Sequence, residues 1–429
     1  MKYKDLENLP YMLYADSDGT VYDHPYFRMA GFSGSTPAAL GTEDLIPMPE
    51  FSKLFYIPDC PPIGLDPNTG EYKVVSELEV DGVLTRCYAV AAFLEPGLVR
   101  SHLPAVDYRP KSYILPTWAY TAVGFRDETY WATGFRIEYN HKWDPRNYDD
   151  RELVPAIEEF KRENASGPLL DHLVNCATKN HCFAAKNLFL KRWEAPLPVS
   201  QGCNAACLGC LSLQPNYLCE ASHHRISFRP SKEEAVSLAV THLNQAPEAI
   251  VSFGQGCEGE PLMEYKLIAD SIKAIRVQTN RGTINLNTNG CCPERIRHVA
   301  DSGLDSIRIS VNSAQPELYQ AYYQPKDYDF EDVAESIALS REMGLYTMLN
   351  YLVFPGITDS EEEIEALRAL IRKTGVNFIH LKNLCIDPQL YLEKMPKPGS
   401  SPLGIKKVVT MLENEFPLLE LGYFNKPVG

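Results

Sequence analysis

The segment CNAACLGC, residues 203–210, places Cys203, Cys207 and Cys210 in one short stretch of the chain. Three thiolates at this spacing can close over one face of a cubane iron–sulfur cluster. Because such a cluster contains four iron atoms, one of them keeps an open coordination position, and an open position on a metal is where ligands bind and react. The segment therefore predicts a reactive [4Fe–4S] cluster.

Zinc is the main alternative for three cysteines so close together. A structural zinc site needs a fourth ligand, which in this chain Cys219, His223 or His224 can supply. Such sites usually combine two CxxC pairs, however, and this segment is not built that way. Unrelated buried thiols are a third interpretation, and the polar flanks of the segment argue against it. Zinc stays open at this point.

Composition and length describe an ordinary globular protein. The 429 residues are enough for two domains, and 45% hydrophobic with 23% charged residues is a typical balance. No stretch approaches about 18 consecutive apolar residues, so no transmembrane helix is expected. The beginning, MKYKDLENLP, has no apolar signal core. We therefore expect a cytoplasmic location, with the twelve cysteines as reduced thiols or metal ligands.

The net charge of −15 limits the choice of partners. Nucleic-acid binding draws most of its affinity from lysine and arginine on a basic face, and the chain has no long basic run. Polynucleotides and anionic membranes are therefore not expected as partners. A small molecule or a peptide fits this charge better.

Short apolar runs alternate with amphipathic stretches in the C-terminal half. The predicted strands are Pro196–Ser200, Ala249–Phe253, Thr283–Asn287, Ser306–Val311, Tyr346–Phe354 and Phe378–Leu384. The predicted helices are Lys232–Leu243, Met263–Val277, Cys292–Ser302, Phe330–Met343 and Ser360–Thr374. Alternation repeated six times predicts a parallel sheet with helices outside it. In such folds the chemistry lies at the carboxyl ends of the strands, which is where the polar motifs fall.

A glycine-rich stretch, FGQGCEGEPL, follows the second predicted strand at residues 253–262. It contains a formal GxGxxG, made by Gly254, Gly256 and Gly259, which is the fingerprint of dinucleotide-binding folds. That fold also needs an acidic residue at the end of the next strand to hold the ribose. The next strand ends NLNTNG, residues 285–290, with no acid. A dinucleotide site is therefore not expected.

The order of these motifs resembles the radical S-adenosylmethionine (SAM) superfamily. The cysteine segment matches its CxxxCxxC signature, and Gly259-Glu260-Pro261 match the last three positions of its GGEP stretch. The resemblance covers roughly residues 193–416. It implies an α/β fold, a partial (β/α)6 TIM-like barrel. It also implies a [4Fe–4S] cluster on the three cysteines and SAM bound at the open iron. In this family, one electron from the cluster cleaves the sulfonium of SAM, which gives a 5′-deoxyadenosyl radical.

The resemblance also implies which residues contact SAM. Glu260 is expected to hold the methionine amino group, and the other contacts lie at the ends of later strands. The implied set is Glu258, Gly259, Glu260, Ser310, Asn312, Asn350, Lys382 and Asn383. Two positions depart from the family pattern: Glu258 replaces the first glycine of GGEP, and Gly209 stands where an aromatic residue usually packs near the adenine.

The remaining cysteines do not form a second cysteine-rich block. Cys291 and Cys292 follow the third predicted strand at the expected catalytic rim, and Cys257 lies beside Glu258. These three are candidates for donating a hydrogen atom or carrying a covalent intermediate, although small apolar packing is the simpler interpretation. Cys176 and Cys182, with His181 between them, fit no metal motif, and buried free thiols are expected there.

The N-terminal half is rich in proline, glycine and aromatic residues. Tyr72–Val80 and Val83–Phe93 predict a hairpin around Asp81-Gly82. A second strand pair is predicted at Ser112–Val123 and Thr129–Tyr139, followed by helices at Arg151–Arg162 and Leu169–Leu190. We therefore predict two domains: a β-rich α+β domain over residues 1–192, with a substrate-selecting lid as its hypothesised role, and the radical SAM partial barrel over residues 193–429.

Together these features predict a radical SAM enzyme suited to a low-oxygen cell. It would take a hydrogen atom from a small-molecule or peptide substrate, after receiving an electron from a reductant such as flavodoxin or ferredoxin. The reaction that follows abstraction is not encoded in the motifs. The alternative from another class is a non-catalytic iron–sulfur or zinc protein that binds a partner or carries electrons.

Overall fold

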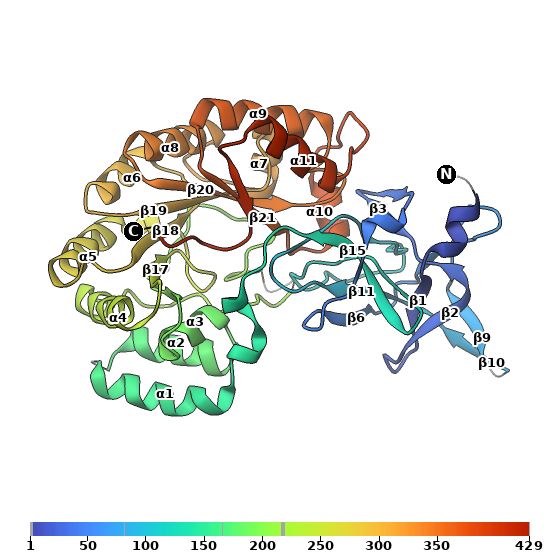
Figure 1. The fold of residues 1–429 in the computed structure, drawn as a ribbon, viewed down its shortest axis with the longest axis horizontal. Helices are drawn as coiled ribbons and strands as arrows, with labels where there is room; N and C mark the ends of the chain where they lie inside the picture. Colours follow the sequence, from blue (N-terminus) through green and yellow to red (C-terminus); the bar gives the residue numbers. More distant parts are fainter. Residues whose placement is uncertain (1–2, 81, 165, 216–218, 429) are drawn as a thin grey trace. The chain divides into compact units, whose positions relative to one another are not determined.

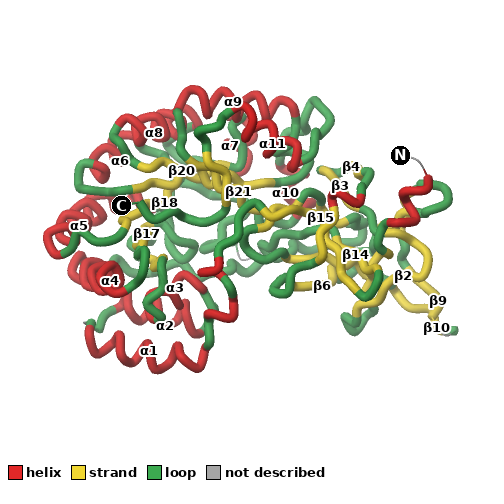
Figure 2. Tube along the Cα trace, in the orientation of Figure 1, coloured by secondary structure: helices red, strands yellow, loops and turns green. Residues whose placement is uncertain are grey.

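The computed structural model describes residues 3–80, 82–164, 166–215 and 219–428. The chain forms two compact units, and each is described by itself. Unit 1 contains Met1–Tyr139, Leu352–Ala366 and Leu381–Pro417; unit 2 contains Asn140–Tyr351, Leu367–His380 and Leu418–Gly429. Figures 1 and 2 show the elements of each.

Unit 2 is built on a seven-stranded sheet in which the strands follow chain order. These strands are β16 Glu194–Pro196, β17 Ile250–Phe253, β18 Thr283–Thr288, β19 Ser306–Val311, β20 Tyr346–Val353, β21 Phe378–Asn383 and β22 Glu420–Gly422. The pairs from β16 to β20 and the pair β21–β22 are parallel. Within the described residues the sheet is open, with β16 at one edge and β22 at the other. This confirms the predicted α/β class and the unclosed sheet.

Helices follow most of these strands. They are α4 Lys232–Gln245, α5 Tyr265–Gln278, α6 Pro293–Ala300, α7 Pro316–Tyr323, α8 Phe330–Glu342 and α9 Glu361–Thr374. Helices α4, α5, α6 and α8 pack in sequence along the outside of the sheet (Figure 1). Short 3₁₀ helices lie at η1 Tyr3–Asn8, η2 Thr42–Asp44, η3 His141–Trp143, η4 Pro145–Asn147 and η5 Pro261–Glu264. The predicted helices of this half agree with the structure, whereas α7 and β22 were not predicted.

The strand β16 ends at Pro196, not at Ser200 as predicted. The reason is a carboxylate: the backbone N–H groups of Val199 and Ser200 donate to Glu258 instead of to a neighbouring strand. The chain therefore leaves the sheet early and begins the loop that carries the three cysteines.

Three helices precede the sheet in unit 2: α1 Asp150–Glu163, α2 Pro168–Thr178 and α3 Phe183–Phe189. The helix predicted over Leu169–Leu190 is wrong in its middle, because the chain breaks between α2 and α3. His181 there has a backbone φ of +49°, which a continuing helix does not allow. The predicted helix Arg151–Arg162 is confirmed by α1, which Asp149 caps by accepting from Arg151 N–H.

Unit 1 is built mainly of short strands. They are β1 Tyr11–Ala15, β2 Val21–Arg28, β3 Gly31–Ser33, β4 Thr36–Ala38, β5 Leu45–Pro47, β6 Lys53–Ile57, β7 Ile63–Leu65, β8 Tyr72–Val74, β9 Glu77–Val80, β10 Val83–Arg86, β11 Tyr88–Phe93, β12 Leu98–Arg100, β13 Leu103–Pro104, β14 Val123–Arg126 and β15 Thr129–Arg136. Ten of them form one sheet, with two- and three-stranded sheets beside it. Its helices are α10 Pro388–Lys394 and α11 Ile405–Glu415.

The predicted hairpins of unit 1 are only partly right. Strands β9 and β10 pair as a hairpin, whereas β8 pairs with β7 and β11 pairs with β1 and β6. Asp81 of the predicted turn lies outside the described residues. In the second predicted pair, Thr129–Tyr139 is confirmed by β15, whereas the strand predicted over Ser112–Val123 is wrong except at its last residue, because the partner strand β14 begins at Val123.

Buried polar contacts join the early and late segments of unit 1. Asn383 accepts from the backbone N–H of Arg100 at 2.9 Å and donates to the carbonyl of Leu98 at 2.9 Å. Lys111 forms a buried ion pair with Asp387. The last residues of β21 and those that follow it are therefore part of the same unit as the β-rich sheet. The predicted domain boundary between residues 192 and 193 remains a prediction.

None of the helices among the described residues is both long enough and apolar enough to cross a membrane.

Two sets of side chains alternate along the strands of unit 2. Ile307 and Ile309 of β19 are fully buried, and Ile309 lies next to Gly290, close to Val333 of the outer helix α8. The intervening side chains form a polar face. Ser252 donates to Glu194 at 2.8 Å. Asn285 donates to Ser252 at 3.1 Å, and Ser306 donates to Asn285 at 2.9 Å. A hydrogen-bonded row thus crosses four strands.

His242 of α4 sets a pH limit on the stability of this unit. Burial lowers its pKa from 6.5 to about 4, and its Nε2 lies 3.3 Å from the carbonyl of Trp193. Between these two pH values the unfolded chain binds a proton that the folded chain does not, so the free energy of unfolding falls as the pH falls, by up to about 1.4 kcal/mol per pH unit.

His242→Gln removes this titration and keeps a donor toward Trp193. We expect wild type to lose more stability than the variant between pH 7 and pH 5, by about 2 kcal/mol. Urea unfolding of both proteins at the two pH values measures it. Equal losses in the two proteins would contradict a neutral, buried His242.

Candidate functional site

The three cysteines lie in the long loop that joins β16 to α4. We call residues 203–210 the cysteine loop. Its backbone rests on the end of α7: the N–H groups of Ala206 and Leu208 donate to the carbonyls of Tyr323 and Tyr322, each at 3.0 Å. The N–H of Cys210 donates to the carbonyl of Cys207 at 3.2 Å. Helix α7 therefore holds the middle of the loop in one conformation.

Residues 258–261, which follow β17, hold the chain just before the cysteine loop. We call residues 258–261 the GEP segment. The N–H of Gly259 donates to the carbonyl of Ser200 at 2.7 Å, and the N–H of Glu260 donates to the carbonyl of Gly202 at 2.8 Å. The two backbones approach so closely that a Cβ on Gly259 would lie 2.0 Å from the Gly202 carbonyl oxygen. Only glycine fits this position.

Glu258 is fully engaged with the backbone. Its Oε2 accepts from the N–H groups of Val199 and Ser200 at 2.7 and 2.9 Å. Its Oε1 accepts from the N–H groups of Gly254 and Gln255 at 2.5 and 3.1 Å. Burial raises the pKa of Glu258 to about 7, and the four hydrogen bonds oppose this shift. A carboxylate has about four acceptor positions, so all of them are filled.

Glu260 is equally buried but less fully occupied. Its Oε1 accepts from the Leu262 N–H and from the Thr288 hydroxyl, and its Oε2 accepts from the Asn289 N–H at 2.9 Å. Burial raises its pKa to about 7. Three of about four acceptor positions are used, so one remains on Oε2.

The three thiols gather beside Glu260. Burial raises the pKa of Cys203 and of Cys207, and the neighbouring thiols and Glu260 add to it. Among the described residues, however, these sulfurs do not form a group in which all atoms lie within 4.8 Å of one another. Four ligands around a single zinc ion, with Zn–S bonds of about 2.3 Å, bring sulfurs to roughly 3.8 Å. A single zinc ion would therefore need these thiols to move closer together.

Arg225 was not predicted and lies against the loop. Its Nη2 donates to Sγ of Cys210 at 3.5 Å, and its Nε donates to the hydroxyl of Ser212 at 3.1 Å. Ser212 donates in turn to the carbonyl of Glu258 at 2.9 Å. One arginine thus connects a cluster thiol to the GEP segment. The sequence carried no signal for it, because it lies in an irregular loop at no motif spacing.

The remaining predicted SAM contacts are spread over both units. Asn350 donates to the hydroxyl of Ser310 at 3.1 Å across β19 and β20. Asn312 is buried and donates to the carbonyl of Leu318 in α7 at 3.1 Å. Lys382 and Asn383 belong to unit 1, where both amide groups of Asn383 are taken by β12. The structure thus brings Ser310 and Asn350 together.

The candidate catalytic cysteines differ in their surroundings. Cys291 is buried, its backbone N–H donates to Oδ1 of Asn289 at 3.0 Å, and burial raises the pKa of its thiol. Cys292 is half-buried at the N-cap of α6. Cys257 is buried next to Cys176, on the side of the GEP segment that faces α2. Their roles as hydrogen donors remain predictions.

The chain is similar in sequence to known proteins. Residues 197–368 match the Radical SAM superfamily. The FeMo cofactor biosynthesis protein NifB of Azotobacter vinelandii is 22% identical over 241 residues, 51% of this chain and 46% of that protein. GTP 3′,8-cyclase of Aquifex aeolicus is 30% identical over 119 residues, 28% of this chain and 36% of that protein. The matched regions therefore span less than half of each relative.

Solved structures resemble the chain more distantly. HydG, a maturase of the [FeFe]-hydrogenase, has a TM-score of 0.38 at 19% identity, covering 64% of this chain and 63% of HydG. Streptococcus suis SuiB bound to S-adenosylmethionine has a TM-score of 0.39 at 12% identity, covering 60% of this chain and 54% of SuiB.

The match over residues 197–368 confirms the predicted resemblance to the radical SAM superfamily. Radical SAM proteins use a [4Fe–4S] cluster and SAM, and the relatives named above are enzymes. In this chain, the geometry of the cysteine loop determines which residues can hold these cofactors.

The contact between Gly259 and Gly202 offers a matched pair of variants. Gly259→Ala pushes a methyl group into the Gly202 carbonyl, so we expect a loss of about 1–3 kcal/mol in the free energy of unfolding. We also expect a clear loss of iron per chain, because the cysteine loop shifts. Gly202→Ala meets no atom within 4 Å and should stay within about 0.5 kcal/mol of wild type.

Denaturant unfolding and iron analysis of the two variants measure these effects. Equal behaviour of the two alanine variants would contradict the close approach of the two loops.

Proposed function

We propose that the radical SAM domain formed around residues 197–368 holds a [4Fe–4S] cluster through Cys203, Cys207 and Cys210, and that the chain is an enzyme acting on a polar small molecule. The observation that supports this is the cysteine loop, which is held between α7 and the GEP segment and carries three thiols at the CxxxCxxC spacing. The open parallel sheet of unit 2 would be the partial barrel around the substrate.

The donor set fits the cluster. The three thiolates would hold three of its irons, and the cluster with SAM would supply the radical chemistry that removes a hydrogen atom from the substrate. The tyrosines at the end of α7 lie beneath the loop and are buried, which keeps water from that side. Tyr319 and Tyr323 stack there with ring centroids 4.5 Å apart.

The two glutamates of the GEP segment take different roles. Glu260 keeps one acceptor position on Oε2, so it can accept a hydrogen bond from the SAM ammonium group. Glu258 has no such position and instead orders the two loops. The proposal therefore keeps Glu260 as a SAM contact and makes Glu258 a positioning residue. Gly259, which is adjacent to both, brings its backbone close to the loop.

Arg225 positions and neutralises Cys210. A guanidinium hydrogen bond to a cluster thiolate stabilises negative charge on it, and hydrogen bonds to the sulfurs are one of the factors that set the reduction potential of a cluster. Ser310, Asn312 and Asn350 are proposed for the ribose and carboxylate of SAM, because they lie at the carboxyl ends of β19 and β20.

The polar face favours a polar substrate. It presents the carboxylate of Glu194 and the buried guanidinium of Arg308, and the side-chain amide nitrogen of Asn287 is buried without a partner in this structure. An apolar substrate would leave the amide nitrogen of Asn287 unpaired at a cost. Two relatives are named for cofactor biosynthesis and for a GTP cyclase, which supports small-molecule chemistry first and peptide modification second.

The charge of −15 places RNA third. An external reductant such as flavodoxin or ferredoxin and a cytoplasmic, low-oxygen setting complete the proposal. No observation favours the alternative of a non-catalytic iron–sulfur or zinc protein.

Cysteine substitution tests the function. Under anaerobic conditions with dithionite and SAM, wild type should form 5′-deoxyadenosine, detected by mass spectrometry. Cys210→Ala should form no more than a blank without protein, because the cluster loses a ligand, and its iron content should fall. Cys385→Ala, a half-buried cysteine in unit 1, is the control and should keep both. Wild-type turnover by Cys210→Ala would overturn the site assignment.

A further inference from the structure

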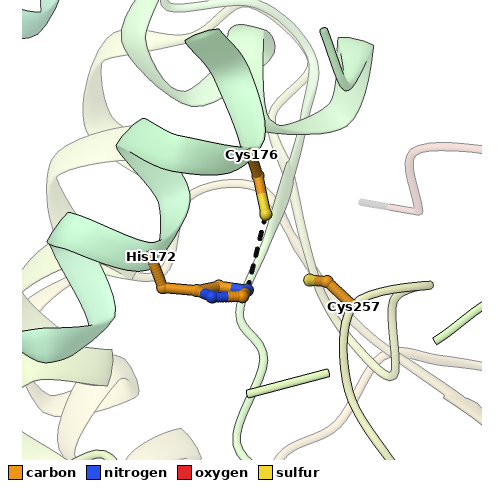
Figure 3. Close-up of side chains that lie close together, drawn as sticks. All are labelled: His172, Cys176 and Cys257. Carbon is orange, nitrogen blue, oxygen red and sulfur yellow. Dashed lines mark hydrogen bonds between the residues drawn. The ribbon is translucent and has the colours of Figure 1, made fainter. Parts of the chain in front are cut away.

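A second group of metal-binding side chains lies in unit 2, outside the cysteine loop. It contains His172, Cys176 and Cys257, whose ligand atoms all lie within 4.8 Å of one another. Sγ of Cys176 and Nε2 of His172 are 3.4 Å apart. Figure 3 shows the imidazole and the two thiols converging on one point.

Two elements far apart in sequence bring these side chains together. His172 and Cys176 are four residues apart on α2, which places them on one face of the helix. Cys257 comes from the loop between β17 and η5, directly before Glu258. Cys176 and Cys257 are only 2% and 5% exposed, while His172 is half-buried. The group is therefore enclosed and reached from the His172 side.

A further imidazole lies beside the group. Nδ1 of His223 is buried and has no hydrogen-bond partner in this structure. A Cβ on Gly256 would lie 3.7 Å from this atom, so the ring lies over the residue that precedes Cys257. The backbone supports this arrangement, because the N–H of Ile226 donates to the carbonyl of Cys257 at 2.9 Å.

Cys182 is the competing fourth ligand. Cys176 raises the pKa of the Cys182 thiol, and Cys182 raises the pKa of the Cys257 thiol. The sulfur of Cys182, however, interacts with the backbone N–H groups of Ala184 and Ala185 at the start of α3. His223, with a buried nitrogen that lacks a partner, is the better choice.

We propose that His172, Cys176, Cys257 and His223 bind one Zn²⁺ ion in a structural site. Two thiolates and two imidazoles are a typical donor set of structural zinc. Metal–ligand bonds of about 2.0–2.3 Å require donors roughly 3.3–3.8 Å apart, so the group needs a small contraction and a rotation of the His223 ring. Binding releases the protons of the two thiols to solvent and changes no oxidation state.

The site would connect α2 to the GEP segment. Cys257 is followed by Glu258. The carboxylate of Glu258 accepts from the N–H of Val199, before the cysteine loop, and from the N–H of Gly254, after β17. A zinc ion at Cys257 would therefore fix one end of this segment without taking part in the chemistry at the cluster. The cysteine loop and the zinc site have no ligand in common, so each can be tested while the other stays loaded.

Metal analysis of the full chain with its iron–sulfur cluster in place tests this proposal. Plasma mass spectrometry should find one zinc for every four irons in wild type. Cys176→Ser and His172→Asn should lose the zinc and keep the iron, and His223→Gln should bind zinc more weakly. Cys182→Ser is the matched control and should keep both metals. Cys210→Ala should lose iron and keep zinc.

A measurement on wild type covers the case in which these variants misfold. Protein made in zinc-depleted medium, with its cluster loaded, is titrated with Co²⁺. One equivalent should bind and give the intense visible bands of tetrahedral cobalt with thiolate ligands, and Zn²⁺ should abolish them.

Three results would overturn the proposal. They are no Co²⁺ uptake by the cluster-loaded protein, full zinc retention in both Cys176→Ser and His172→Asn, or a Cys176–Cys257 disulfide in protein isolated without metal. Because every readout is a metal count or a metal spectrum, failure here leaves the proposed radical chemistry untouched, and failure of that chemistry leaves the zinc count unchanged.

Discussion

The close backbone contact between the GEP segment and the residues before Cys203 is the constraint on which the site depends. Gly259 permits this contact because it has no side chain, and the carboxylate of Glu258 then collects four N–H groups from both loops. The cysteine loop is held from its other side by the carbonyls at the end of α7. Three thiols thus acquire a fixed spacing before any metal is bound, which lowers the entropy lost on assembling a cluster.

The carboxylates of Glu258 and Glu260 lie near this contact and have different proposed roles. Both Glu258 and Glu260 are buried, and burial raises the pKa of each. What distinguishes them is the number of donors that they already accept, since the first has no free acceptor position and the second has one. The proposed positioning role and the proposed SAM contact therefore lie two residues apart in one turn. Directly before that turn, Cys257 lies beside His172 and Cys176 of α2.

Much of this could be predicted from sequence. The spacing of the three cysteines, together with the motifs that follow it, predicts a cluster, and strand–helix alternation indicates the parallel sheet of unit 2. Helix α7 was missed, as was Arg225, because short or irregular segments carry no periodic pattern. The role of Glu258 depends on N–H groups of two separate loops, which no local pattern reveals. His172 and Cys176 show helical spacing, but their third partner lies on a distant segment, so only the fold could bring them together.

The central claim is that three thiolates leave one iron open for SAM. Electron paramagnetic resonance of the anaerobically reduced cluster, recorded with and without SAM, tests it most directly. The account predicts that the spectrum of the reduced cluster changes on adding SAM, because the ligand binds to an iron of the cluster. Superimposable spectra at saturating SAM, from a protein with a fully formed cluster, would contradict it.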